Sequence, residues 1–306
     1  ASDVYKRQKQ ILEQFYQKTQ GEITRSFLSR MITRLESEQS VKEYLDIMDH
    51  RKTEQLIDTL DKVEQNRKEC YIREFSIEHF HDSKVFETLI PKICKIFREE
   101  NEELTGFENE EILAEYQIYK TPGYVYMKGN VQIYSAGKQA ADISAFPEGI
   151  AVAVGSEEDV PDICPDQTID KVFTIENLTS FYRFKQEHSL VIYLGGYHDR
   201  SRRNLLMQIY QKLPDAQYYH FGDLDAGGFY ILEHLKRKTG IPFQMFQMDI
   251  ETLKKYEDYA KPLTENDKKR LMQLEKMELP DEERKLITYM LQKGIKLEQE
   301  CISESQ

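Results

Sequence analysis

Residues 217–235 restrict the fold of this chain most strongly, because they have the pattern of a strand that leads directly into a helix. They begin with an aromatic run at residues 218–221, which is typical of a β-strand. Apolar side chains then recur at helical spacing, at Phe229, Leu232 and Leu235. A strand followed closely by a helix is the repeating unit of α/β proteins, so the segment predicts an α/β fold.

Two further apolar runs extend this prediction. Residues 171–175 and 190–194 are short and suit strands, and each is followed by a stretch that suits a helix. Alternating strands and helices indicate a mostly parallel sheet with right-handed crossovers. Ligands bind such sheets beyond the carboxyl ends of the strands. Glu176 follows the first run and a Gly-Gly turn follows the second, so both are expected at that edge.

Two aspartates lie at the junction between strand and helix in residues 217–235. In extended backbone, Asp223 and Asp225 would project to the same side. Gly227 and Gly228, which follow them, allow a tight turn and the close approach of another group to the backbone. With Glu176, these carboxylates are the oxygen ligands that Mg²⁺ and Mn²⁺ prefer. We therefore expect Glu176, Asp223 and Asp225 to form a divalent-cation site.

A Glu after one strand and an Asp-x-Asp after a later strand resemble the Toprim domain of topoisomerases, bacterial primases and related nucleases. The resemblance is closer to the JetD family of the Wadjet plasmid-defence system, which is related to the topoisomerase VI A subunit. The segments that resemble this family are Phe75 with residues 81–84, residues 173–179, 220–229, 248–249 and 296–300.

The resemblance implies a Toprim domain with a Rossmann-like, mostly parallel sheet at residues 166–306. A winged-helix (CAP-like) DNA-binding module is expected before it, at residues 71–165. Within that module, residues 124–127 and 131–134 read as a β-hairpin that turns on Gly-Asn. Residues 1–70 are polar with apolar side chains at helical intervals, which predicts amphipathic helices in an N-terminal arm or a helical subdomain.

The resemblance also implies a metal-dependent DNA endonuclease that cuts phosphodiester bonds of circular DNA. Glu176, Asp223 and Asp225 would bind Mg²⁺ or Mn²⁺ as its cofactor. The expected partners are double-stranded DNA, subunits of an SMC-like condensin complex and a second copy of the chain. Topoisomerase VI A subunits have their cleaving tyrosine in a pattern like Arg-Asp-x-Tyr-Tyr, which this sequence lacks. A non-catalytic DNA-binding adaptor and a topoisomerase VI A-like strand-cleaving protein remain as alternatives.

Basic side chains near these segments are candidates for DNA contact. Lys84 is expected to reach the scissile phosphate as a catalytic and DNA-binding residue, whereas Asp82 beside it is equally suited to cap a helix. Arg200, Arg202 and Arg203 follow the Gly-Gly turn. They either contact a phosphate or are solvated at the start of a helix.

Composition limits the other functions that this chain could perform. A net charge of −12, with 54 acidic and 42 basic residues, argues against non-specific coating of nucleic acid. The four cysteines lie far apart, which indicates neither a zinc site nor a disulfide framework. No apolar run is long enough to span a bilayer and the N-terminus lacks a signal-peptide pattern. We therefore expect a cytoplasmic protein without a membrane partner.

The sequence leaves the roles of four further residues open. Asp249 follows a strand-like run and either lies near the carboxylate edge or caps the next helix. Glu298 and Glu300 would point to different sides of a helix, so they cannot both face the carboxylate site in the same way. The alternative is that they form an ordinary exposed helix end. His198 is either an acid–base group or a solvent-exposed loop histidine.

Overall fold

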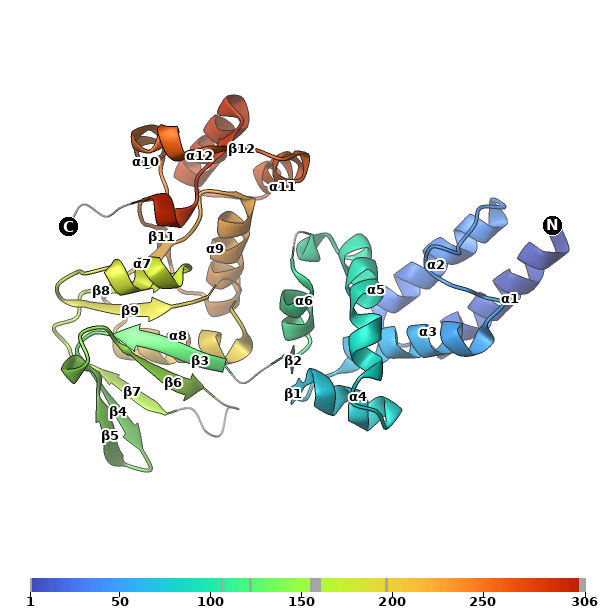
Figure 1. Ribbon diagram of the computed structural model, residues 1–306, viewed down its shortest axis with the longest axis horizontal. Helices are drawn as coiled ribbons and strands as arrows, with labels where there is room; N and C mark the ends of the chain where they lie inside the picture. The colour runs from blue at the N-terminus through green and yellow to red at the C-terminus, as the bar shows by residue number, and fades with distance from the viewer. Residues whose placement is uncertain (1, 106, 121–122, 155–160, 196–197, 303–306) are drawn as a thin grey trace. The chain divides into compact units, whose positions relative to one another are not determined.

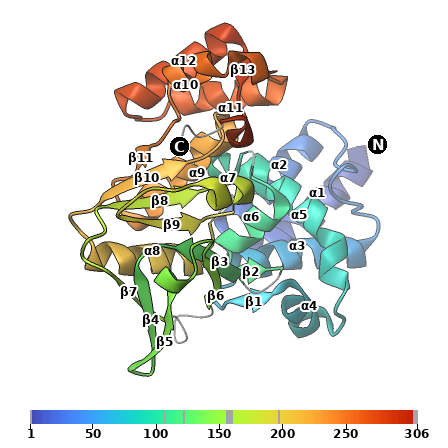
Figure 2. The ribbon, with the colours of Figure 1, turned by 60° about the vertical axis from the view of Figure 1, so that its left-hand side comes forward.

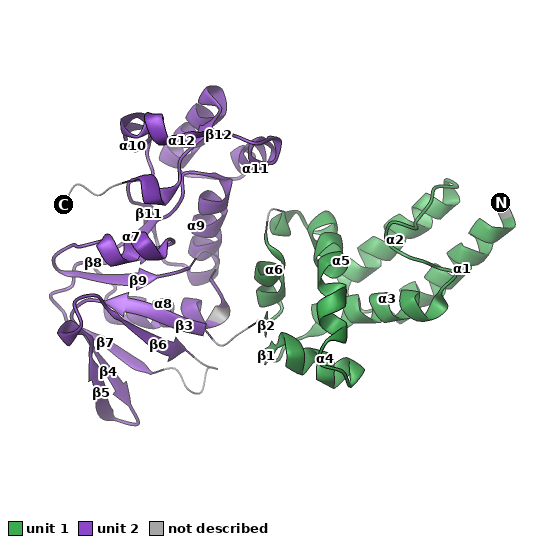
Figure 3. Cartoon of the chain, viewed as in Figure 1, with its two compact units in different colours: residues 1–121 green, residues 122–306 purple. Residues whose placement is uncertain are grey.

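The computed structural model describes residues 2–105, 107–120, 123–154, 161–195 and 198–302 (Figure 1). Within this range the chain divides into two compact units, residues 1–121 and residues 122–306 (Figure 3). Helices and a parallel-rich sheet together make it a mixed α/β protein. No helix in the described residues has both the length and the apolar character needed to cross a membrane.

The first unit is mainly helical. The helices predicted within residues 1–70 are confirmed, and three more follow them before residue 121. Two short strands pair in parallel. The elements are α1 (Ser2–Lys18), α2 (Glu22–Glu36), α3 (His50–Gln65), β1 (Cys70–Tyr71), α4 (Ile72–Phe80), α5 (Val85–Glu100), η1 (Glu102–Leu104), α6 (Asn109–Glu115) and β2 (Ile118–Tyr119).

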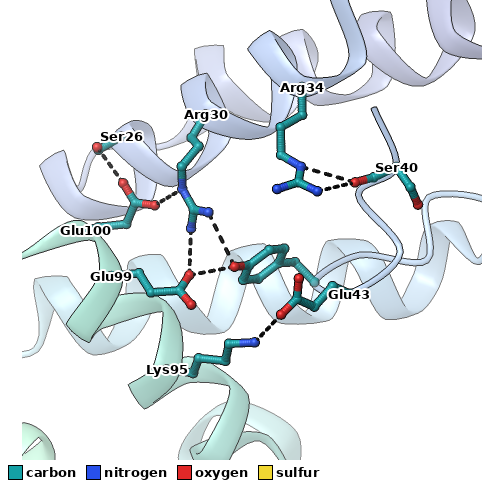
Figure 4. Close-up of polar contacts among 9 residues, drawn as sticks. Ser26, Arg30, Arg34, Ser40, Glu43, Lys95, Glu99 and Glu100 are labelled. Carbon is teal, nitrogen blue, oxygen red and sulfur yellow. Dashed lines mark hydrogen bonds and ion pairs between the residues drawn. The ribbon is translucent and has the colours of Figure 1, made fainter. Parts of the chain in front are cut away.

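A network of ion pairs joins α2 to α5 (Figure 4). The Arg30 guanidinium donates to Glu99 at 2.9 Å and to Glu100 at 2.5 Å. The Tyr44 hydroxyl also donates to Glu99, at 2.8 Å. These contacts tie the N-terminal helices to α5 within the first unit, which ends at residue 121.

A short turn at residues 81–84 connects α4 to α5. His81 ends α4 in the left-handed conformation, with a φ of 54°. The rings of Phe75 on α4 and Phe86 on α5 pack with their centroids 4.5 Å apart. Two packed helices joined by so short a turn have the connectivity of a helix–turn–helix motif.

The second unit contains a six-stranded sheet in the order β11-β10-β8-β9-β3-β6 among the described residues (Figure 2). Four neighbouring strands are parallel: β11 (Gln244–Met245), β10 (Gln217–Phe221), β8 (Lys171–Ile175) and β9 (Ser189–Tyr193). The remaining two, β3 (Gly123–Lys128) and β6 (Ile150–Val154), extend it in antiparallel pairs. The predicted mostly parallel sheet is therefore confirmed.

The expected hairpin between residues 124–127 and 131–134 is wrong. β3 pairs with β6 and β9, whereas β4 (Val131–Ser135) joins a separate sheet with β5 (Lys138–Asp142) and β7 (Asp162–Pro165). Val125 and Met127 of β3 and Val131 and Ile133 of β4 are buried in the same core, so the two runs pack together without pairing as a hairpin. Both expected wing strands therefore lie in the second unit.

Helices cover both faces of the large sheet, so its central strands are buried on both sides. Apolar side chains of α8 (Arg200–Lys212) and α9 (Ala226–Thr239) pack on one face with Val172 and Leu190. Phe181 of α7 (Leu178–Arg183) packs on the other face with Phe173 and Phe221. Apolar side chains of α10 (Ile250–Lys255), α11 (Glu265–Glu275) and α12 (Asp281–Lys293) belong to the same core as Phe173, Phe181 and Phe221. The remaining short elements are η2 (Ile143–Ala145), η3 (Glu257–Tyr259), β12 (Lys261–Pro262), β13 (Ile295–Lys296) and η4 (Gln299–Cys301).

Candidate functional site

The carboxyl ends of β8 and β10 bring two of the predicted site residues together. These strands are neighbours, with Ile175 in register with Phe221. Glu176 follows the first strand, and its N–H donates to the Phe221 carbonyl oxygen at 3.0 Å. Its Oε2 accepts from the N–H of Asp223 at 3.4 Å. The parallel pairing thus places Glu176 beside Asp223, 47 positions further along the chain.

Glycine is required on both sides of Asp223, because a side chain there would collide with neighbouring atoms. A Cβ at Gly222 would lie 2.6 Å from Oε2 of Glu176 and 2.8 Å from Nε2 of His220. A Cβ at Gly228 would lie only 2.1 Å from the main-chain oxygen of Asp223. A side chain at Gly228 would displace the loop that bears the aspartates, which agrees with its expected role, and one at Gly222 would displace the Glu176 carboxylate or the His220 ring.

Each aspartate of the Asp-x-Asp pair uses one oxygen inside the protein. Asp225 caps α9, where its Oδ1 accepts from the N–H of Gly228 at 2.8 Å. Oδ1 of Asp223 accepts from the N–H of Gln299 at 2.6 Å. Oδ2 of each aspartate makes no hydrogen bond to the described part of the chain, so it remains a possible ligand atom.

Negative charge is concentrated around Asp223. The pKa of its carboxyl is raised to about 6, mainly by burial and also by the nearby carboxylates of Asp225, Glu298 and Glu300, against the lowering effect of the Gln299 N–H. Ionised Asp223 is therefore in an unfavourable environment in the protein alone. A bound cation would relieve this repulsion.

The C-terminal segment completes this edge of the sheet. Leu297 and Leu224 exchange main-chain hydrogen bonds of 3.1 and 2.9 Å. Glu298 then accepts from Lys261 at 2.5 Å, and Glu300 accepts from the Asn177 amide at 2.5 Å. The α-helix expected to end here is wrong: the segment is an extended bridge followed by the 3₁₀ helix η4.

Sequence reasoning missed Gln299, whose side chain is fully buried in this segment. Gln299 lies in residues 296–300, a segment that resembles the JetD family, but no periodicity distinguishes a buried glutamine between two glutamates. Only the contacts of the folded chain reveal it.

The donor set suits a hard divalent cation. Glu176, Asp223 and Asp225 at the ends of β8 and β10 offer carboxylate oxygen, which is the ligand chemistry of Mg²⁺ and Mn²⁺. No group of three His, Cys, Asp or Glu side chains in the described residues is close enough to hold an ion unaided. Mg²⁺ typically keeps several waters and uses one or two carboxylates with substrate phosphates, so the adjacent Glu176 and Asp223 fit such an ion.

The basic candidates occupy different settings. Lys84 lies in the first unit at the start of α5, with an exposed side chain and an N–H that donates to Asp82 at 2.7 Å. Arg202 pairs with Asp199 at 2.8 Å, and Arg203 donates to the His198 carbonyl oxygen at 2.9 Å. The side chain of Arg200 lies outside the described residues. DNA contact by these four residues stays a prediction.

Two other open roles are answered by local structure. Asp249 caps α10, where its Oδ1 accepts from the Thr252 N–H at 2.7 Å. His198 is fully buried, so a solvent-exposed loop position is wrong. Burial holds its pKa well below the usual value, and the ring of His234 lies 5.0 Å from its own.

Comparison with known proteins agrees with these features. The family model for the C-terminal part of the Wadjet protein JetD matches residues 158–306, which include Glu176, Asp223 and Asp225. The Wadjet protein JetD of Bacillus cereus (strain Q1) is 28% identical over 263 residues, which cover 84% of this chain. The chain spans 63% of the length of that relative. Together these matches identify the chain as a JetD-like protein.

Proposed function

We propose that this protein is a Mg²⁺- or Mn²⁺-dependent DNA endonuclease whose second unit is a Toprim catalytic domain. The observation that supports this best is the hydrogen-bonded meeting of Glu176 and Asp223 at the ends of two neighbouring parallel strands. Asp225 lies on the same loop and begins α9. Such strand ends are where α/β sheets bind ligands, so Glu176 and Asp223, with Asp225 on the same loop, are suited to share a cation whose shell is completed by water and substrate phosphate.

Glu176, Asp223 and Asp225 would hold the cation. When bound, the cation would offset the charge that develops on the phosphodiester and lower the pKa of a water nucleophile. The chain itself fixes the ligands: the N–H groups of Gln299 and Gly228 each hold one aspartate oxygen. Because the pKa of Asp223 is about 6, its carboxylate is mostly ionised at neutral pH and available to a cation.

The α4–turn–α5 part of the first unit is proposed to bind double-stranded DNA as a helix–turn–helix motif, without the wing expected at residues 124–134. The α4–turn–α5 arrangement supports this, because the second helix of such a motif commonly enters the major groove. Lys84 lies exposed at the start of that second helix and would contact a phosphate. Further phosphate contacts are proposed for Arg200, Arg202 and Arg203.

The biological role is proposed from similarity to the Wadjet protein JetD. We place the chain in a Wadjet-type plasmid-defence system in the cytoplasm, where it would cut circular DNA engaged by an SMC-like condensin complex. A homodimer would supply one site for each DNA strand.

A second candidate function is a non-catalytic DNA-binding adaptor. The observation that favours it is that the described residues contain no preformed group of three metal-binding side chains. In this case the strand-end acids would serve only to hold the fold, and the protein would bind DNA without cutting it.

Plasmid cleavage and metal binding separate the two functions. Purified protein is incubated with covalently closed plasmid in Mn²⁺ or in EDTA, and Mn²⁺ binding is titrated without DNA. We expect nicked or linear plasmid only with Mn²⁺. Asp223→Ala should abolish both cleavage and Mn²⁺ binding but leave folding nearly intact, because Asp223 contributes little apolar packing.

Asp249→Asn is the matched control, since Asp249 also follows a sheet strand and caps a helix, and its Oδ1 accepts from Thr252 on that helix. This variant should cut like the wild type. The endonuclease proposal fails if Asp223→Ala cuts at the wild-type rate. Absence of Mn²⁺ binding by the wild type would support the adaptor instead.

A further inference from the structure

Gln299 lies where the C-terminal segment meets the ends of β8 and β10. Its side chain is fully buried, although the neighbouring residue Glu300 is exposed. A buried amide must satisfy its donors and acceptor inside the protein, because an unpaired one costs about 1–3 kcal/mol.

All three hydrogen bonds of Gln299 in this region go to the strand ends that bear the carboxylates. Its Oε1 accepts from the Asn177 N–H at 2.8 Å, directly after Glu176. Its Nε2 donates to the Phe221 carbonyl oxygen at 3.0 Å. Its own N–H donates to Oδ1 of Asp223 at 2.6 Å. A single residue thus binds the end of β8, the end of β10 and one of the carboxylates.

The Phe221 carbonyl oxygen is the point at which these contacts converge. It accepts from the Gln299 amide at 3.0 Å and from the Glu176 N–H at 3.0 Å. The separation between Glu176 and Asp223 is therefore set by Gln299 as well as by the pairing of the two strands. Loss of the amide would remove two of the hydrogen bonds that hold the strand ends, and would leave the Glu176 N–H on Phe221 and the 3.4 Å contact between Glu176 and Asp223 in place.

The segment that presents Gln299 is itself anchored on both sides. Leu297 exchanges two main-chain hydrogen bonds with Leu224, the residue between the two aspartates. Glu300 accepts from the side chain of Asn177 at 2.5 Å. Gln299 is consequently held between two attachments and has little freedom to move away from the site.

We propose that Gln299 is a positioning residue that sets the geometry of Glu176 and Asp223 for cation binding, and that residues 297–300 form part of the functional site. This inference rests on the proposed metal-dependent function. Gln299 does not contact the reacting atoms; it acts through the two carboxylates. Partners in this outer position typically change metal affinity or activity by about 10–100-fold when they are replaced.

Gln299→Met tests the proposal, because methionine has a similar length and keeps the main-chain N–H but loses both amide contacts. The matched control is Gln208→Met, which removes a comparable side-chain contact to the Ile163 N–H at 3.1 Å elsewhere in the same unit. Mn²⁺ affinity is measured by titration without DNA. Plasmid cleavage is then followed against Mn²⁺ concentration, and melting is followed by calorimetry.

We expect Gln299→Met to weaken Mn²⁺ binding by about 10-fold or more, and to shift the Mn²⁺ dependence of cleavage to higher concentration. Gln208→Met should leave both unchanged, even if it melts at a similarly lower temperature. Gln299→Asn, which keeps a shorter amide, gives a second variant if the methionine variant does not fold.

The proposal is overturned if Gln299→Met binds Mn²⁺ as tightly as Gln208→Met does. It is also overturned if neither Gln299 variant folds, since the residue would then be needed for the fold rather than for the site. Failure of the wild type to bind Mn²⁺ is a different result, because it would remove the proposed function itself.

Discussion

Asp223→Asn should make the metal-free protein more stable while it abolishes cleavage. Asparagine keeps the shape of the side chain and an Oδ1 that can accept from the Gln299 N–H. It removes a negative charge from a partly buried position close to Asp225, Glu298 and Glu300. The substitution therefore separates the electrostatic cost of this carboxylate from its packing.

The size and sign of the effect follow from the pKa of Asp223. This pKa is about 6 in the folded protein and has an ordinary value of 3.8. At pH 8 the carboxyl is ionised in both states, so the difference between the two values destabilises the wild type by up to about 3 kcal/mol. The folded state binds the proton more tightly, so this cost decreases as the pH falls through 6 towards 3.8. At pH 5 about half of it remains.

Calorimetry in EDTA is the appropriate assay, because the chain has no tryptophan to report unfolding by fluorescence. For a unit of this size, about 3 kcal/mol corresponds to a rise of roughly 6–12 °C in Tm. Mg²⁺ at 100-fold over its Kd should then stabilise the wild type by about 2.7 kcal/mol and leave Asp223→Asn unchanged.

Asp249→Asn provides the control, because Asp249 caps a helix in an exposed position and its replacement should change stability by about 0.5 kcal/mol or less. Two results would refute the reasoning. One is an Asp223→Asn variant that is no more stable than the wild type at pH 8 in EDTA. The other is a gain in stability of the same size at pH 8 and pH 5.

Three further predictions concern other parts of the chain. Gly228→Ala should lower the free energy of unfolding by about 3 kcal/mol and abolish Mn²⁺ binding, because its Cβ would lie 2.1 Å from the Asp223 main-chain oxygen. Gly227→Ala, whose Cβ would lie 3.1 Å from Oδ1 of Asp225, should be tolerated in both calorimetry and Mn²⁺ titration. Arg30→Met should destabilise the first unit by about 3 kcal/mol, because the Glu100 side chain is only 6% exposed and would lose its ion pair with the Arg30 guanidinium. An unchanged calorimetric melting temperature would contradict this. Burial lowers the pKa of His220 to about 3, so between pH 6.5 and 3 only the unfolded state gains the proton. Acidification from pH 7.5 to 5 should therefore lower the free energy of unfolding by about 2 kcal/mol, and denaturant unfolding of His220→Gln should not show this loss.

The large sheet and its carboxylate edge were predictable because short-range patterns encode them. The run at residues 171–175 and the aromatic run at residues 218–221 both form strands, and the spacing of Phe229, Leu232 and Leu235 forms α9. Once two such strands are parallel neighbours, geometry alone brings the residues that follow them to one edge.

The hairpin expected at residues 124–134 shows where local patterns fail. Two β-prone runs joined by Gly-Asn satisfy every local rule for a hairpin. Val125 instead pairs with Val152 of β6, Met127 pairs with Ile192 of β9, and β4 pairs with β5 and β7. Partner choice among strands depends on the whole core, which a local pattern does not contain.

By itself, then, the sequence determined the strands, the helices and the acids that follow β8 and β10. Only the tertiary structure decided that residues 297–300 return to those strand ends and that Gln299 binds both of them. The physical reason is that hydrogen bonds between residues 78 and 122 positions apart leave no periodic trace in the sequence. They exist only because the packed core of the second unit brings the C-terminal segment to the carboxylates.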